Sequence, residues 1–380
     1  APEALVYVGF LASLVLALTG LPFIRYAVYL MPFFALAVWL VATSHSFNFS
    51  RDVLAFFLMA SLSLPSLFPW DFNTFKKIYF IFVFVTVFLL FDFAKINLDM
   101  RKLSIALIGL GLFNGLTRNA SGSVEGFSVI DSQSMLETTF AFPLIMVSLY
   151  LILTRKYVFG VIAFVFAVVF LKRIAILAYL VALLVWFLPK RLRRFLLSPI
   201  LLTVGGSLVV LLSVAFANGF FDEWIFDALQ KSPNDLSKGR QVLWYSAIVA
   251  CDFRVGDFIL FGEGIGKVTT ELQQELRVDR VLLHNDLLTL VLEIGLIPYL
   301  LFIYLFVSVK AEMGRLFALV MLVLFSTDNV LIYQHVMFIY FFIQAQIRRS
   351  SLSFAEIRKR PSTVRRPVPS VAGDTKTSRR

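Results

Sequence analysis

The hydrophobic residues of this chain form a succession of apolar runs from Ala4 to about Ile347, separated by short polar or basic turns. A helix needs about 20 consecutive apolar residues to cross the hydrocarbon core of a bilayer. Because runs of that kind follow one another, the pattern predicts an all-α polytopic membrane protein with about twelve transmembrane helices. The predicted spans are 4–20, 22–43, 53–68, 78–93, 103–117, 135–153, 157–171, 174–188, 195–217, 285–309, 315–327 and 330–347.

The composition also indicates a lipid environment. Apolar residues make up 59% of the chain, charged residues make up 16%, and 42 residues are phenylalanine. That is more hydrocarbon than the surface of a soluble globule of this length accommodates. The first apolar run continues into the second without a small-residue cleavage site, so we predict a membrane span there and not a cleaved secretion signal. The single cysteine, Cys251, excludes an intramolecular disulfide.

The formal charge of +11 is unevenly distributed, because ten Lys and Arg residues lie in the last 33 positions, beyond the last predicted span. A basic tail after a span is typical of a cytoplasmic segment held near anionic lipid, so the charge gives no reason to expect nucleic acid as a partner. Prolines and serines in this tail predict that residues 348–380 are disordered.

The charges in the turns predict the orientation in the membrane. With a cytoplasmic N-terminus, twelve positive side chains lie in short inner loops and six in short outer loops, as expected from the excess of Lys and Arg in cytoplasmic loops. The inner positions are Arg51, Lys95, Arg101, Lys102, Arg155, Lys156, Lys190, Arg191, Arg193, Arg194, Lys310 and Arg315, and the outer ones are Arg25, Lys76, Lys77, Arg118, Lys172 and Arg173. Residues 1–217 then hold helices 1–9, segment 218–284 is a periplasmic loop with short helices, and residues 285–347 hold helices 10–12.

Residues 157–188 pose a choice between one long span and two short ones, because Lys172 and Arg173 lie at their middle. A single span would bury both charges near the bilayer centre, at a cost of roughly 2.5–3.5 kcal/mol each on insertion scales. Two short helices joined by a turn avoid this cost and keep the basic loops on both sides cytoplasmic. We therefore predict two helices, with Lys172 and Arg173 at the outer surface.

His284 is one of only three histidines and begins the stretch HNDLLTLVLEIGLI. Asn285 and Asp286 can cap the helix that starts there, and the spacing of Asp286, Thr289 and Glu293 places their side chains on one helical face. An ionisable residue inside a span is by default a candidate functional residue. The alternative for His284 is a capping or interfacial histidine.

The preference of Lys and Arg for cytoplasmic loops does not explain three cations on the predicted outer side. Lys172 and Arg173 lie in a tight turn where few charges are expected, and Arg240 begins a predicted helix with Trp244 on the same face at i+4. An anionic ligand would explain them, since an arginine fork binds phosphate oxygens bidentately. The alternative is that these side chains extend to lipid headgroups.

The start of the last predicted span adds further polar residues to the outer side. Asp328 and Asn329 begin this span, and His335 lies about two turns further in. His335 is either a second pocket residue or a buried histidine bonded to a neighbouring helix.

Other patterns in the outer segment do not indicate a nucleotide or metal site. FGEGIGK at 261–267 lacks the GKS or GKT ending and the preceding strand of a nucleotide-binding loop, so we interpret it as a flexible turn. Asp222, Glu223 and Asp227 could hold a metal, but a helix face that mixes acidic and aromatic residues favours an interfacial surface. No nucleophile-elbow motif supports serine-based catalysis.

Five stretches together resemble the superfamily of O-antigen ligases and Wzy-type polysaccharide polymerases. They are LKRIAIL (171–177), GRQVLW (239–244), FGEGIG (261–266), HNDLLTLVLEIGLI (284–297) and TDN (327–329). In that family an arginine follows an outer-facing turn, a large periplasmic loop carries another arginine, and a His-x-x-x-Leu…Glu-x-Gly segment opens the next span. The resemblance covers about residues 160–345, and its strength lies in the order of the stretches.

The resemblance implies an integral-membrane glycosyltransferase of the GT-C type in the bacterial inner membrane, with its active site facing the periplasm. The donor would be a glycan on undecaprenyl pyrophosphate, the transfer would be inverting, and neither a metal nor another cofactor would be needed. By this resemblance His284 corresponds to the proposed general base, and Arg173 and Arg240, with Lys172 beside them, to the pyrophosphate-binding cations. Asp286, Glu293, Asp328, Asn329 and His335 are possible pocket residues.

Within the family, LKR and TDN are more similar to the exopolysaccharide and O-antigen polymerases, which transfer the growing chain to another lipid-linked repeat unit. A chain-length regulator is then an expected partner. The alternatives are a ligase of lipopolysaccharide biosynthesis, which transfers the glycan to lipid A core, and a protein-glycosylating relative. A rival from another class is a non-enzymatic transporter of lipid-linked glycan, but the unexplained charges gather at the outer face and not at the midplane.

Overall fold

The computed structural model of the chain describes residues 1–18, 24–42, 47–49, 72–119, 136–251, 255–277 and 281–359. In these ranges the chain forms helices joined by turns, and no β-strand occurs within them. The prediction of an all-α fold is therefore confirmed. The predicted span 53–68 lies outside the described residues.

The first part of the chain forms helices close to the predicted spans. They are α1 (Pro2–Ala17), the 3-10 helix η1 (Ile24–Leu30), α2 (Met31–Val41), α4 (Phe72–Leu90), the 3-10 helix η3 (Phe93–Lys95) and α5 (Met100–Asn119). Pro2 and Pro32 lie in the first turns of α1 and α2, where proline is tolerated because those N–H groups have no partner within the helix.

The middle of the chain confirms the predicted turn at Lys172. The helices there are α6 (Ala141–Leu153), α7 (Tyr157–Val169), α8 (Arg173–Phe187), α9 (Lys190–Leu196) and α10 (Pro199–Ala217). Leu171 has a left-handed φ of 40°, which ends α7 and lets α8 begin two residues later. Residues 157–188 therefore form two helices and not one.

Segment 218–284 contains a group of short helices, as predicted. They are α11 (Asp222–Leu229), α12 (Pro233–Leu236), α13 (Arg240–Ala250), α14 (Val255–Leu260) and α15 (Lys267–Leu276). In this group α13 packs against α10 and α15, α14 against α17, and α15 against α16 and α4. The segment is therefore joined to the helices on either side of it.

The predicted span 285–309 is not one continuous helix, because two helices occupy it: α16 (Asp286–Ile294) and α17 (Leu296–Val307). Gly295 lies between them with a φ of 85°, and Gly262 crosses it so closely that a Cβ atom on Gly295 would meet Gly262 N at 2.8 Å. Glu263 N and Gly264 N donate to the carbonyls of Leu292 and Glu293, each at 2.9 Å. The glycine-rich turn thus caps the end of α16, a role that the interpretation as a flexible turn missed.

The last part of the chain comprises α18 (Glu312–Phe325), the 3-10 helix η4 (Val330–Ile332) and α19 (Gln334–Lys359). Residues 336–347 of α19 are all buried, as expected for a helix that is apolar on every side. α19 extends twelve residues beyond the predicted end at 347, to Lys359. The prediction of disorder is therefore wrong for residues 348–359, while 360–380 lie outside the described residues.

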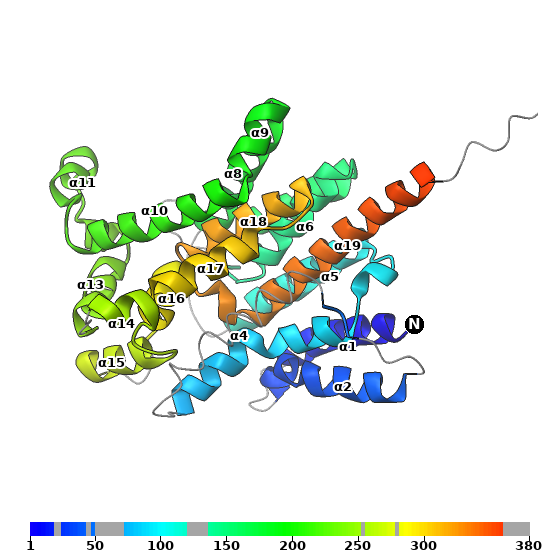
Figure 1. The fold of residues 1–380 in the computed structure, drawn as a ribbon, viewed down its shortest axis with the longest axis horizontal. Coiled ribbons are helices and arrows are strands. Elements are labelled where there is room, and N and C mark those ends of the chain that lie inside the picture. Colours follow the sequence, from blue (N-terminus) through cyan, green and yellow to red (C-terminus); the bar gives the residue numbers. More distant parts are fainter. Residues whose placement is uncertain are drawn as a thin grey trace, which may run out of the picture.

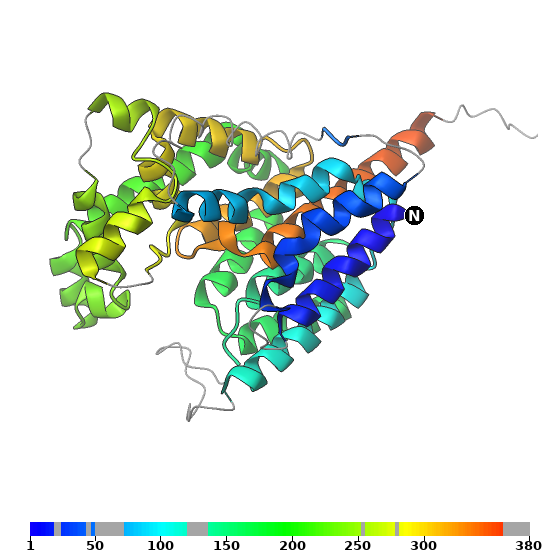
Figure 2. The same ribbon diagram turned by 90° about the horizontal axis from the view of Figure 1, so that it is seen from below.

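The two ends of the molecule are built from different parts of the chain. In Figure 1 the helices of segment 218–284 gather at the left, and Figure 2 shows the same grouping after a quarter turn. The N-terminus and the last turns of α19 lie at the opposite, right-hand end in both views. We call these the loop end and the terminal end.

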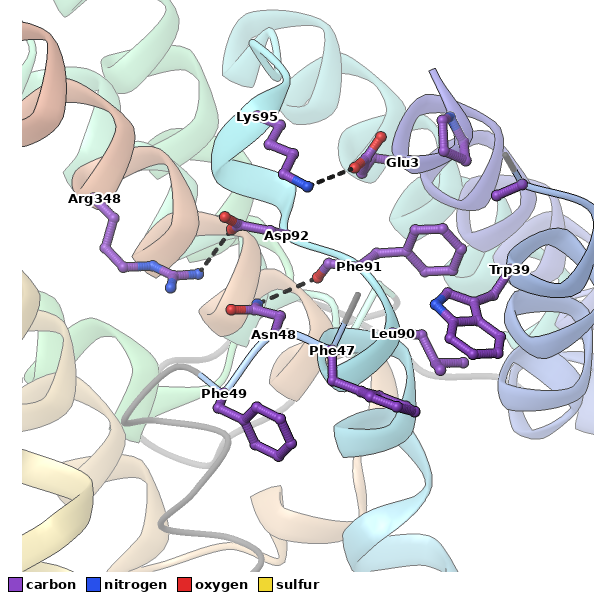
Figure 3. Close-up of a pocket in the computed structure, with 12 residues that line it drawn as sticks. Glu3, Trp39, Phe47, Asn48, Phe49, Leu90, Phe91, Asp92, Lys95 and Arg348 are labelled. Carbon is purple, nitrogen blue, oxygen red and sulfur yellow. Dashed lines mark hydrogen bonds and ion pairs between the residues drawn. The ribbon is translucent and has the colours of Figure 1, made fainter. Parts of the chain in front are cut away.

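The terminal end holds a cavity of about 380 Å³, which we call the terminal cavity (Figure 3). Its four charged lining side chains form two opposite pairs: Lys95 Nζ lies 4.0 Å from Glu3 Oε1, and Arg348 Nη2 lies 3.4 Å from Asp92 Oδ1. Its charged lining side chains therefore carry no net charge.

Length and apolar composition allow one helix of the described residues, α10, to cross a bilayer by itself. Only 28% of the residues in its apolar stretch are buried inside the protein. A row of exposed apolar side chains follows the helix: Ile200, Val204, Leu208 and Leu211. Other apolar helices, such as α6 and α7, have 13 residues each and are about 20 Å long.

Candidate active site

A cavity of about 600 Å³ lies at the loop end, and we call it the loop cavity. It is lined by the start of α8, the end of α10, the start of α13 and the turn before η4. Its charged lining side chains are four cations and two carboxylates: Lys172, Arg173, Lys238, Arg240, Glu137 and Asp328. The loop cavity therefore carries a net positive charge, unlike the terminal cavity.

The turn between α7 and α8 brings Lys172 and Arg173 to this cavity. Lys172 immediately precedes α8, and its Nζ lies 2.6 Å from Glu137 Oε1. Arg173 is the first residue of α8 and is exposed. The sequence predicts an anionic partner for Lys172, and the Glu137 carboxylate is one such partner.

Arg240 enters the cavity from the first position of α13. Gly239 precedes it with a φ of 83°, and Arg240 Nη1 donates to the Thr327 carbonyl at 2.8 Å. Trp244, one turn later, lines the same cavity, so the prediction that the two share a face is confirmed. Trp244 Nε1 donates to the Leu283 carbonyl at 2.7 Å, which ties α13 to the residue before His284.

Electrostatics at Arg240 reflect its half-buried position. Burial lowers the pKa of the Arg240 guanidinium, the Asp328 carboxylate opposes this change, and the positive charge of Arg173 adds to it. Arg240 and Arg173 therefore repel each other across the cavity. Binding of an anion between them would relieve that repulsion.

His284 lies directly before α16, in a left-handed conformation with a φ of 53°. Asn285 is the N-cap, as predicted, and its side chain accepts from Leu288 N at 2.9 Å. His284 Nδ1 lies 3.4 Å from Asp328 Oδ1 and 3.2 Å from Asn329 Nδ2. Because Asp328 also lines the loop cavity, His284 adjoins the cavity wall that holds the arginines.

The neighbours of Asp328 favour its carboxylate form. Burial raises the pKa of Asp328. Hydrogen bonds from His284 and from the Asn329 backbone lower it, and so do the positive charges of His284 and Lys172. The lowering effects are larger in sum, so the pKa of Asp328 lies below its usual value. A carboxylate only accepts hydrogen bonds, so it favours the tautomer with a proton on Nδ1. The lone pair then lies on Nε2. The Asn329 amide can present either its oxygen or its nitrogen, so it is compatible with this tautomer.

The predicted polar face of α16 exists but does not reach the loop cavity. Asp286, Thr289 and Glu293 line a separate small cavity of about 30 Å³ together with Lys77 of α4. Lys77 forms an ion pair with the buried Glu293 carboxylate, and Asp286 Oδ2 accepts from Leu331 N at 2.8 Å. These contacts anchor α16 to α4 and η4. Asp286 and Glu293 therefore support the site without lining it.

His335 lies outside the three cavities described above. Its ring centroid is 5.1 Å from that of Phe140 and 6.0 Å from that of Tyr333. Its Nε2 atom is buried without a hydrogen-bond partner among the described residues. A hydrogen bond joins the His335 ring to the backbone of Thr139, so the structure favours the alternative of a buried histidine bonded to a neighbouring segment.

Three residues of the site were not found from the sequence: Glu137, Lys238 and Tyr333. Glu137 lies 35 positions from Lys172, and Tyr333, whose hydroxyl donates to Asp328 Oδ1 at 3.0 Å, carries no recognisable motif. The separation of Glu137 from Lys172 is too long for a local spacing to relate them, and Tyr333 lies five positions from Asp328. No protein-family model, no curated protein and no solved structure matches the chain.

Proposed function

We propose that the protein is a membrane glycosyltransferase that polymerises polysaccharide at the periplasmic face of the bacterial inner membrane. It transfers a glycan from undecaprenyl pyrophosphate to a hydroxyl group of a second lipid-linked repeat unit. The proposal rests above all on one observation: Lys172, Arg173 and Arg240 line one cavity whose wall residue Asp328 contacts His284.

The arrangement of charges supports a twelve-span orientation with segment 218–284 in the periplasm. Each salt bridge found among the described residues joins two segments that this orientation assigns to the same side. The inner pairs are Lys95–Glu3, Arg101–Asp99, Arg193–Glu312, Arg194–Glu312 and Arg348–Asp92, and the outer pairs are Lys77–Glu293, Lys172–Glu137 and His284–Asp328. In this arrangement α16 and α17 together make one crossing.

The charge of the loop cavity suits a diphosphate. Its lining has two more cations than carboxylates, and a diphosphate that bridges a sugar and a polyprenol is a dianion. Arginine forks bind such oxygens bidentately, and a half-buried guanidinium acts in a medium where its charge is less screened than in water. Apolar lining residues, including Leu177 and Phe216, lie beside the cations. The polyprenol can therefore stay in lipid while the sugars stay in water.

In the proposed reaction the acceptor hydroxyl oxygen attacks the anomeric carbon of the donor glycan. The bond between that carbon and the diphosphate oxygen breaks, and its electron pair leaves with the diphosphate. His284 Nε2 takes the hydroxyl proton as general base, and the Asp328 carboxylate balances the imidazolium that forms. Arg173 and Arg240 stabilise the charge that develops on the leaving group. Attack opposite to the leaving group inverts the anomeric configuration.

The interrupted helix at Gly295 is the one observation that favours the rival transporter, since broken helices often form substrate sites in transporters. In such sites the free helix ends face the substrate. Here the carbonyls of Leu292 and Glu293 are occupied by Glu263 N and Gly264 N, and the Glu293 carboxylate is paired with Lys77. The break therefore fits a structural joint better than a transport site.

Replacement of His284 tests the proposal directly. Purified His284→Ala, supplied with lipid-linked repeat unit, should lose at least about 100-fold in transfer rate, because a positioned general base contributes about that much or more. Binding of the pyrophosphate-linked donor should remain within about twofold of wild type, since the cations are retained. The readout is polymer length and initial rate.

His335→Phe is the matched control, because it keeps an aromatic ring beside Phe140 and lies outside the loop cavity. It should polymerise at a near-normal rate. Polymer of normal length from His284→Ala would remove His284 from the mechanism.

A further inference from the structure

The Lys172–Glu137 pair puts a second carboxylate, besides Asp328, into a cavity whose charged lining is mainly cationic. Glu137 precedes α6 and Lys172 precedes α8, so two separate helix starts bring the pair together. Lys172 Nζ and Glu137 Oε1 are 2.6 Å apart, and their side chains are 24% and 37% exposed. Both residues line the loop cavity. A ligand in the cavity can therefore reach Lys172 only in competition with Glu137.

The pair has little value for folding stability alone, because partly exposed ion pairs are weakly stabilising. In a reaction that releases a diphosphate, the pair can instead affect how tightly the product binds. When the glycan leaves, the diphosphate loses one ester bond and gains one negative charge. Cations that stabilise this change in the transition state also bind the product more tightly than the donor. Without a competing anion, Lys172, Arg173 and Arg240 would retain the polyprenyl diphosphate after each transfer.

We propose that Glu137 is an internal counter-ion that competes with the diphosphate for Lys172 and thereby promotes product release. This inference rests on the proposed function and adds a residue to it. Glu137 takes back the Lys172 ammonium as the polyprenyl diphosphate leaves. It also weakens donor binding, but by less, because the donor carries one negative charge fewer.

The test is binding of farnesyl diphosphate to the full chain in detergent, measured by calorimetry. Glu137→Gln keeps the shape of the side chain and removes its charge, so it should tighten binding by about two- to fivefold. Farnesyl monophosphate should show a smaller gain. In a Lys172→Gln background the Glu137→Gln change should have no effect, because its partner is gone.

Glu275→Gln is the matched control, since Glu275 is an exposed carboxylate on α15 outside the loop cavity. Equal tightening by this variant would assign the effect to overall charge and overturn the proposal. Unchanged affinity in Glu137→Gln, with normal binding by wild type, would overturn the role of Glu137 and leave the proposed function intact. If wild type does not bind farnesyl or undecaprenyl diphosphate, the proposed function fails and this inference with it.

A kinetic readout separates competition from a purely structural role. Undecaprenyl pyrophosphate should inhibit polymerisation by Glu137→Gln at a concentration about two- to fivefold lower than for wild type. The turnover rate at saturating donor should fall together with the donor KM. A variant that only loosened the site would instead raise the KM, and that result would contradict the proposal.

Discussion

The loop cavity and the terminal cavity contain the same kinds of charged residue in different proportions. In the terminal cavity two cations face two carboxylates, as Figure 3 shows for Lys95 with Glu3 and Arg348 with Asp92. In the loop cavity four cations face two carboxylates, and one of these, Asp328, also contacts a histidine. A balanced cavity has no electrostatic demand for a ligand, whereas a cavity with excess positive charge has one.

This difference shows that counting arginines does not locate a site. Arg193 on α9 is a counter-example, because it pairs with Glu312 and its guanidinium lies 4.3 Å from the centre of the Trp186 ring. Such a cation holds helices together. Arg240 instead combines a carbonyl contact with a place in the loop cavity beside Arg173. Unbalanced charge in a shared cavity is what distinguishes a candidate binding residue here.

The largest expected contrast is between one arginine of each cavity. If the proposed function holds, Arg240→Ala should lower the transfer rate by about 100-fold or more, because it removes a group that we propose to stabilise developing negative charge. Arg240→Lys should restore the rate only partly, since an ammonium lacks the planar fork. The measurements are initial transfer rate and affinity for the pyrophosphate-linked donor.

Arg348→Ala is the matched variant in the terminal cavity, and its transfer rate should stay within about twofold of wild type. Equal losses in Arg240→Ala and Arg348→Ala would erase the distinction between the two cavities.

A second test concerns the helix break that supports the loop end. Gly295→Ala should destabilise the protein by about 2–4 kcal/mol, because the new Cβ would meet the backbone of Gly262 and Phe261 in a left-handed conformation. The thermal unfolding midpoint in detergent reports this change. Gly205→Ala on α10, where no atom lies within 4 Å of the added Cβ, should be neutral or slightly stabilising. Similar midpoints for the two variants would show that the crossing of Gly262 and Gly295 does not constrain the fold.

The smallest expected effect is the pH dependence that Asp328 adds to stability. Since the pKa of Asp328 is lowered in the folded protein, its contribution is present above the unfolded pKa of about 3.9 and is lost as the pH falls through the lower folded value. The free energy of unfolding of wild type should therefore exceed that of Asp328→Asn by about 1 kcal/mol at neutral pH. The difference should vanish in strong acid. Unfolding midpoints between pH 1.5 and 7 measure it, and a gap that persists unchanged down to the acid end of this range would count against the charged contact with His284.

Local patterns in the sequence were enough for the helical character, the turn at Lys172 and the capping of α16 by Asn285. Each depends on residues within a few positions of one another, such as an apolar run or the N-cap spacing. The shared faces of Arg240 with Trp244 and of Asp286 with Glu293 follow from helical periodicity in the same way. The sequence therefore determined which side chains point together along one helix.

Only the tertiary structure decided which helix faces pack against one another. Glu293 pairs with Lys77 at a separation of 216 positions, and Glu137 pairs with Lys172. Gly262 packs against Gly295, where the helix is interrupted although the sequence pattern predicts one continuous apolar span. No periodicity encodes such partners, because their contact depends on how distant helices pack and not on spacing within one helix. For the same reason His284 is placed beside the cationic cavity, while His335, predicted only as a possible pocket residue, is placed outside it.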